Sequence, residues 1–200
     1  KQALLKKGIP EDVLMEARLI SPGKEGRDSF DFFRDRVMFP IFDLRGRPVA
    51  FGGRVMGEGE PKYLNSPDTP LFHKGQIVYG LALARELAST KREIIVAEGY
   101  MDVIALAQAG FTNAVAPQGT SITEMQLVLL RRYFSQVECF FDSDSAGQKA
   151  ALRFLPMALK AGIEVRFLGQ AGQTKVDPDL LFLERGLDAY AELQSHALSA

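Results

Sequence analysis

Short apolar runs alternate with amphipathic stretches from residue 81 to the end of the chain. This pattern predicts strands at residues 93–97, 113–116, 137–141 and 163–168, and helices at 81–90, 100–109, 123–134, 145–161 and 178–185. The run at 93–97 is apolar after its first residue, which is typical of a strand that is buried on both faces. Strands that alternate with helices favour a parallel sheet covered by helices on both sides, so we expect an α/β fold.

Residues 1–80 follow a different pattern. Apolar positions at helical spacing predict short helices within residues 1–20. Alternating apolar positions on either side of a turn at 43–46 predict a β-hairpin across 34–54. Pro40 lies in the first arm of this hairpin and favours a sheet edge, because proline has no backbone N–H to donate. We therefore expect a smaller mixed α+β subdomain ahead of the parallel sheet.

Composition limits the class of protein. The chain has 200 residues, of which 46% are hydrophobic, enough for a buried core in one or two domains. No apolar run approaches the ~18 residues of a membrane-spanning helix, and the first residues show no signal peptide. Cys139 is the only cysteine, which excludes an internal disulfide and a multi-cysteine zinc site. We expect a cytoplasmic monomer with no membrane partner.

Charge is unevenly distributed although the net charge is only −1. Residues 1–80 hold 13 Lys and Arg against 11 Asp and Glu, whereas residues 81–200 hold 11 against 14. The first part is therefore slightly basic and the second slightly acidic. This balance does not by itself indicate nucleic-acid binding, because mixed solvated surfaces look the same.

Acidic residues gather where the predicted strands end. Glu98 and Asp102 follow the 93–97 strand, Asp142 and Asp144 follow the 137–141 strand, and Asp177 and Asp179 follow the 163–168 strand after a loop. Each has a structural alternative: Asp144 and Asp177 are good helix N-caps, and Asp102 suits a first helical turn. A single Asp-x-Asp pair is also weak evidence for a site.

The acids are more informative as a group. Ligands of open α/β sheets bind at the carboxyl ends of the strands, and neighbouring strands lie ~4.8 Å apart. Two carboxylates ~4 Å apart repel by about 4 kcal/mol at an effective dielectric near 20. A cluster of this kind is kept when its members share protons or when it binds hard cations, and oxygen ligands without His or Cys favour Mg²⁺ or Mn²⁺. We expect Glu98, Asp142 and Asp144 to meet in one solvent-open pocket.

Two of these segments resemble known motifs. Glu-Gly-Tyr-Met-Asp at 98–102, followed by Phe-Asp-Ser-Asp-Ser-Ala-Gly at 141–147, resembles a Toprim domain, the metal-binding module of bacterial primases, type IA and II topoisomerases and some nucleases. Residues 36–41, 51–54, 62–67 and 72–75 narrow the resemblance to the DnaG-type bacterial DNA primases. The motifs occur in the order of that family and cover nearly the whole chain, so the resemblance implies the RNA-polymerase core of a primase.

The resemblance assigns roles to the acids by their place in the motifs. Glu98 matches the acid expected as metal ligand or general base, and Asp142 and Asp144 match the metal-binding pair. Asp177 and Asp179 match a second pair that assists a further cation, and Asp102 is a supporting acid. Ser143 and Ser145 stand where the family often has Gly and Arg, so no phosphate contact by an arginine is expected there.

The resemblance also assigns residues to nucleic-acid or nucleotide binding. These are Arg34, Arg36, Arg54, Lys62, Asn65 and Lys74. Arg34 and Arg36 stand two positions apart, so we expect them to share one face of a strand. Phosphate contacts of this type position a strand without reading its sequence. The alternative is an ordinary charged strand face.

The implied activity is template-directed synthesis of short RNA primers on single-stranded DNA from ribonucleoside triphosphates. It uses two or more Mg²⁺ or Mn²⁺ ions. The implied domains are an N-terminal binding subdomain at 1–80, a Toprim domain at 81–186 and the start of a helical subdomain at 187–200. The replicative helicase and a zinc-binding module are expected partners of the full-length protein, through regions absent from this chain.

Three other functions remain open. The chain could be another Toprim enzyme, such as a nuclease or a topoisomerase fragment, although the motifs before residue 80 disfavour this. A haloacid-dehalogenase-like phosphatase would use Asp142 as a nucleophile, yet that motif normally lies near the N-terminus. A Toprim scaffold that only binds DNA or a partner would not need Glu98, Asp142 and Asp144.

Overall fold

The structure, a computed structural model, describes residues 1–24, 26–119, 121–141, 145–168, 181, 188 and 190–199. Its contacts divide the chain into two units, Lys1–Lys74 and Gly75–Ala200. The predicted helix at 178–185 lies outside the described residues except for Leu181. No helix among the described residues is both long enough and apolar enough to cross a membrane.

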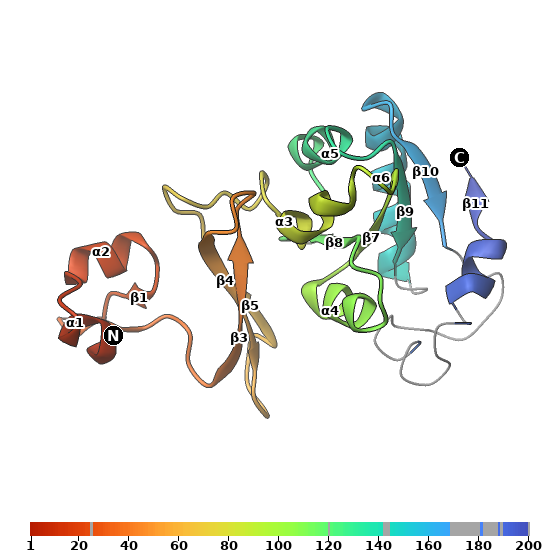
Figure 1. Cartoon of the computed structure of the whole chain (residues 1–200). Coiled ribbons are helices and arrows are strands. Elements are labelled where there is room, and N and C mark those ends of the chain that lie inside the picture. The colour runs from red at the N-terminus through yellow and green to blue at the C-terminus, as the bar shows by residue number, and fades with distance from the viewer. Residues whose placement is uncertain are drawn as a thin grey trace. The chain divides into compact units, whose positions relative to one another are not determined.

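The first unit combines short helices with antiparallel strands (Figure 1). Its elements are α1 (Gln2–Lys6), α2 (Glu11–Glu16), β1 (Ile20–Ser21), β2 (Phe30–Asp31), β3 (Arg36–Phe42), β4 (Pro48–Val55) and β5 (Tyr63–Asn65). β1 pairs with β2, and β3, β4 and β5 form a second sheet in that order. The predicted hairpin is confirmed as β3–β4, and Pro40 lies on the edge strand of its sheet.

The second unit is built on a six-stranded sheet in the order β11-β10-β9-β7-β8-β6 (Figure 1). The strands are β6 (Val78–Tyr79), β7 (Glu93–Ala97), β8 (Ala114–Pro117), β9 (Gln136–Phe140), β10 (Glu164–Phe167) and β11 (Leu198–Ser199). The four central strands are parallel, as predicted, and the two edge strands are antiparallel to their neighbours. The helices are α3 (Leu81–Ala84), α4 (Tyr100–Gln108), α5 (Glu124–Arg131) and α6 (Ser145–Lys160), with a 3₁₀ turn at Arg85–Leu87.

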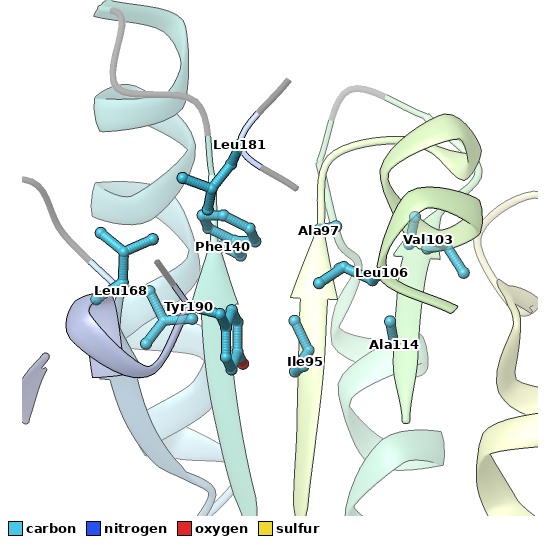
Figure 2. Packing of buried hydrophobic residues seen from close by; sticks show 11 residues of the cluster. Ile95, Ala97, Val103, Leu106, Ala114, Phe140, Leu168, Leu181 and Tyr190 are labelled. Atoms are coloured by element: carbon cyan, nitrogen blue, oxygen red, sulfur yellow. The ribbon is translucent and has the colours of Figure 1, made fainter. Parts of the chain in front are cut away.

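Alternation along β7 directs its side chains to two buried faces. Ile95 and Ala97 join a core cluster with Val103 and Leu106 of α4. Figure 2 shows these α4 side chains beside β7 and β8, and it shows Leu181 and Tyr190 beside β9. On the opposite face, Phe154 of α6 packs edge-on against Phe141, with 6.0 Å between ring centroids. Helices therefore cover both sides of the parallel sheet, as the sequence predicts.

A glycine fixes the chain at the start of α3. Gly80 has φ +83°, and a Cβ at this position would lie 2.7 Å from the carbonyl oxygen of Ala114. Both the left-handed backbone and the close approach to β8 require glycine here. The predicted helix at 81–90 is shorter than expected, because α3 ends at Ala84 and continues only as the 3₁₀ turn.

Strand β9 carries a buried carboxylate within the core. Glu138 is 3% exposed. It accepts a hydrogen bond from the hydroxyl of Tyr190 at 2.8 Å and from Nε2 of Gln194 at 3.0 Å. These contacts attach helical residues 190–195 to the sheet, and β11 then pairs with β10. The next residue of β9, Cys139, is buried, and burial raises the pKa of its thiol well above the ordinary value.

Candidate active site and nucleic-acid interface

Glu98 lies at the carboxyl end of β7, in the turn that leads into α4. The N-cap residue of α4 is Gly99, whose backbone N–H donates to Oδ2 of Asp102 at 2.9 Å. Asp102 is thus the N3 residue of a capping arrangement, and one of its oxygens holds the helix start. This bond fixes the turn that carries Glu98.

The neighbouring strand ends at the same edge of the sheet. β7 and β9 are parallel, and their register pairs Ala97 with Phe140. Glu98 and Phe141 are the next residues of the two strands, and both line the same hollow. Asp142 and Asp144 follow Phe141 in the sequence but lie outside the described residues, as do Asp177 and Asp179.

The hollow beside Glu98, called here the Glu98 hollow, has a volume of about 470 Å³. Its lining combines apolar side chains with Glu98, Ser121 and the cationic Arg153 of α6. The other lining residues are Val96, Pro117, Gly119, Ile122, Phe141, Ala150, Phe154 and Met157. Sequence reasoning did not select Arg153, which lies two helical turns beyond the start of α6 and shows no motif of its own.

The donor chemistry of this edge suits a hard cation. Glu98 supplies carboxylate oxygens, and the sequence places further carboxylates directly after Phe141. Oxygen donors without His or Cys are the ligands that Mg²⁺ and Mn²⁺ prefer. Among the residues that the structure describes, no three His, Cys, Asp or Glu side chains form a group that could hold a metal ion. A complete site therefore needs acids from the remaining positions.

In the first unit, Arg36 lies flat across its own sheet. Its Nη1 donates to the carbonyl oxygens of Gly53 and Lys62, each at 3.4 Å. A Cβ at Gly53 would lie 3.0 Å from Cδ of Arg36 and from a ring carbon of Phe33. The glycine thus leaves room for the arginine, and Arg36 is partly occupied in holding β4 and β5 together.

The expectation that Arg34 and Arg36 share one strand face is wrong. β3 begins only at Arg36, and Asp35 between the two arginines has φ +52°. A left-handed residue interrupts the extended backbone, so the simple two-residue alternation does not reach Arg34. The guanidinium of Arg34 lies instead over the ring of Phe30, 5.0 Å from its centroid.

An exposed tyrosine stands between two cations on the three-stranded sheet. Tyr63 of β5 is 42% exposed and pairs across the ladder with Arg54 of β4. The guanidinium carbon of Arg54 lies 6.0 Å from the ring centroid, and Nζ of Lys62 lies 5.6 Å from it. Asn65 is two residues further along β5 and therefore on the same face. Tyr63 was not selected from the sequence as a binding residue, although its position next to Lys62 is a signal that could have pointed to it.

Lys74 closes a polar loop at the end of the first unit. Its backbone N–H donates to Oδ1 of Asp68 at 3.0 Å, and this bond holds the pKa of Asp68 below its ordinary value. Nδ1 of His73 lies 3.7 Å from Oδ2 of Asp68. The carboxylate of Asp68 thus orders residues 68–74, the loop that carries Lys74.

Two family models match consecutive parts of the chain. Residues 1–85 match the N-terminal domain of the DNA primase catalytic core, and residues 92–169 match a Toprim domain. The two matches fall on the antiparallel sheet of the first unit and on the parallel sheet that carries Glu98. The fold is that of a Toprim protein of the primase type.

Individual relatives agree with these models. The DNA primase of Pseudomonas putida is 50% identical over an alignment of 194 residues, which covers 94% of this chain but only 29% of that protein. A DNA primase domain from Pseudomonas aeruginosa is 45% identical, with a TM-score of 0.85 over 98% of this chain and 63% of the other. A DnaG primase catalytic domain bound to single-stranded DNA is 42% identical, with a TM-score of 0.87 over 98% and 62%. The chain belongs to the DnaG-type bacterial DNA primase family and spans less than a third of the Pseudomonas putida relative.

Proposed function

We propose that this chain is the catalytic core that joins ribonucleotides into short RNA primers on a single-stranded DNA template. The observation that carries the proposal is the position of Glu98 at the end of β7, beside the strand that leads to Asp142 and Asp144. A similar primase catalytic domain binds single-stranded DNA, which supports the template assignment. The match of residues 1–85 to a primase domain favours this activity over the nuclease, topoisomerase, phosphatase and scaffold alternatives.

In this proposal Glu98, Asp142 and Asp144 hold two or more Mg²⁺ or Mn²⁺ ions, assisted by Asp177 and Asp179. The bound cations neutralise phosphate charge and lower the pKa of the primer 3′-hydroxyl. Glu98 acts as metal ligand or accepts the hydroxyl proton, and Asp102 keeps its turn in place. Arg153 supplies a positive charge to the Glu98 hollow, in a chain that has serine at position 145.

The first unit is proposed to hold the template or the incoming nucleotide. Arg54, Lys62, Tyr63 and Asn65 share one strand region, where cations beside an exposed ring suit a single strand with unstacked bases. Arg34, Arg36 and Lys74 complete the proposed binding set. The replicative helicase and a zinc-binding module are proposed partners of the full-length protein. The domain limits 1–80, 81–186 and 187–200 and a cytoplasmic location also remain proposals.

A primer-synthesis assay tests the site. Ribonucleotides, single-stranded DNA and Mn²⁺ or Mg²⁺ are incubated with the chain and with Glu98→Gln and Asp142→Asn variants. Both variants should lose at least about 100-fold in rate, because removing a charge-stabilising group costs roughly this factor. Glu93→Gln, which changes the same residue type at the other end of β7, should keep normal synthesis. Full synthesis by Glu98→Gln would contradict the assignment.

A further inference from the structure

A second hollow lies at the opposite end of the parallel sheet, and we call it the arginine hollow. It has a volume of about 700 Å³ and is lined by Ala88, Arg92, Arg131, Arg132, Tyr133, Phe134, Ser135 and Gly162. Arg92 directly precedes β7 and Ser135 directly precedes β9, so the hollow marks the amino ends of these strands. Glu98 lies six residues beyond Arg92, which at about 3.3 Å per residue corresponds to about 20 Å.

Three arginines with exposed side chains share this hollow. Arg92, Arg131 and Arg132 are all exposed, and within the described part of the chain none of them forms an ion pair with a carboxylate. Two acids on adjoining elements have other partners: Glu164 accepts from Gln136 at 2.9 Å, and Glu124 pairs with Lys160 at 3.2 Å. Like charges gathered in one concave surface repel, and they create a field that attracts an anion.

Ordinary structural roles explain part of the cluster, because Arg132 is the C-cap residue of α5 and Arg131 directly precedes it. Arg131 stands in the last turn of α5, where a cation complements the helix dipole. Its Nε also donates to the carbonyl oxygen of Gly162 at 3.2 Å. For Arg92 and Arg132 the described residues show no hydrogen bond from the guanidinium group, and both side chains are exposed. Their cationic groups line the hollow and are accessible to an anionic ligand.

We propose that the arginine hollow binds the phosphates of a single-stranded nucleic acid, with a base stacked on Tyr133. Guanidinium groups recognise phosphate through paired N–H donors, and the hydroxyl of Ser135 adds a further donor. A half-buried tyrosine ring beside the cations favours nucleic acid over an acidic polypeptide, because bases stack on aromatic rings. Whether the bound strand is the DNA template or the RNA product rests on the proposed function. The binding itself does not depend on the chemistry at Glu98.

The first test measures affinity for a fluorescent oligodeoxynucleotide by anisotropy, without divalent ions or nucleotides. In a Tyr63→Ala background, which weakens binding at the first unit, Arg92→Gln/Arg132→Gln should lower the affinity about 25-fold at 0.1 M salt. The slope of log affinity against log salt should fall by about 1.4, since each phosphate contact to a single strand contributes about 0.7. Lys160→Gln is the control, because it also removes a positive charge but one that is already paired with Glu124. Unchanged affinity and slope in the double variant would overturn the proposal.

The second test reports from the hollow itself. The chain contains no tryptophan, so Tyr133→Trp introduces a single fluorophore at the proposed stacking position. Oligonucleotide addition should quench its emission, and Arg92→Gln/Arg132→Gln in the same background should abolish the quenching at equal concentration. Emission that does not respond at saturating oligonucleotide would refute stacking on residue 133.

Two comparisons separate this inference from its rivals. Poly-glutamate is the competing ligand. If it binds as tightly as DNA, and if the same double variant abolishes this binding, the hollow is a site for acidic polypeptides and the nucleic-acid assignment is overturned. Glu98→Gln should abolish primer synthesis and leave the oligonucleotide affinity of the hollow unchanged. If the variants of the arginine hollow bind DNA normally while Glu98→Gln still abolishes primer synthesis, the binding site in the arginine hollow is disproved and the proposed function is not.

Discussion

Tyr63 combines a large exposed ring with two cations that approach it from neighbouring positions. Arg54 reaches the ring from across the ladder, and Lys62 reaches it from the preceding residue. Cations held over a ring keep it in one orientation and stabilise it by roughly 0.5–1 kcal/mol at exposed sites. The ring is thus a fixed platform, which a base could use without a large loss of side-chain entropy.

We predict that Tyr63→Ala weakens binding of single-stranded DNA by about 10-fold, because a base stacked on an aromatic ring contributes roughly 1–3 kcal/mol. Tyr63→Phe should bind almost normally, since it keeps the ring and removes only the hydroxyl. Anisotropy titrations of both variants at one salt concentration give the comparison. Equal losses in the two variants would point to the hydroxyl rather than to stacking.

The sequence predicted the positions of single residues best where they directly follow the end of a strand. Glu98 lies where the end of an apolar run placed it, because the limit of a buried strand is visible in the apolar pattern. Arg34 was misplaced, since a left-handed Asp35 leaves no signal in hydropathy. Arg153 and Tyr63 were missed because each reaches its site through packing between segments distant in sequence. The roles of Asp142, Asp144, Asp177 and Asp179 stay predictions.

Helical residues 190–195 and strand β9 meet through a hydrogen-bonded carboxylate. Glu138 accepts from Tyr190 and from Gln194 in a buried setting. We predict that Tyr190→Phe lowers the free energy of unfolding by about 2 kcal/mol, because a buried acceptor loses a donor. Urea unfolding measures the change, and Tyr63→Phe, an exposed tyrosine, should change it by less than about 0.5 kcal/mol. An equal effect at both positions would exclude a special role for the Glu138 bond.

The same contact makes stability depend on alkaline pH. Burial and the nearby Glu138 carboxylate raise the pKa of Tyr190 above its ordinary value. The unfolded chain loses this proton near pH 10, whereas the folded chain keeps it, so stability falls as pH rises above about 10. Tyr190→Phe has no such proton, so the stability difference between the two proteins should shrink from pH 9 to pH 11. Parallel curves in urea unfolding across this range would contradict the raised pKa.

Among the elements, the parallel strands were predicted well and the edge strands were not. β7, β8 and β9 are mainly apolar, β10 alternates charged and apolar residues, and both patterns are readable in one sequence. β5, β6 and β11 have two or three residues each, too few to show any period. Their places depend on pairing with β4, β8 and β10, which local patterns do not encode.

The whole chain consists of two units with separate buried residues. Leu14, Ile20 and Ile41 are buried in the first, whereas Ile95 and Leu106 belong to the core cluster of the second. Each unit therefore has apolar surface of its own to bury, and each can resist local opening by itself.

We predict that Leu106→Ala weakens only the second unit, because a Leu→Ala change in a core costs roughly 2–5 kcal/mol. Amides of β7 and β9 should exchange hydrogen faster, while those of β3 and β4 keep their rates. Ile95→Val, a milder change in the same cluster, should give the same pattern at smaller size. Faster exchange in β3 and β4 as well would mean that the two units unfold together.

The single cysteine of the chain opens a practical route to labelling. Cys139 is enclosed in β9 and its thiol stays protonated at neutral pH, so a maleimide dye will react with it very slowly. A cysteine introduced on the surface, for example Ser135→Cys at the mouth of the arginine hollow, would then be modified alone, with the native thiol left in place. Dyes attached one at a time in this way can follow a bound strand from either end of the sheet.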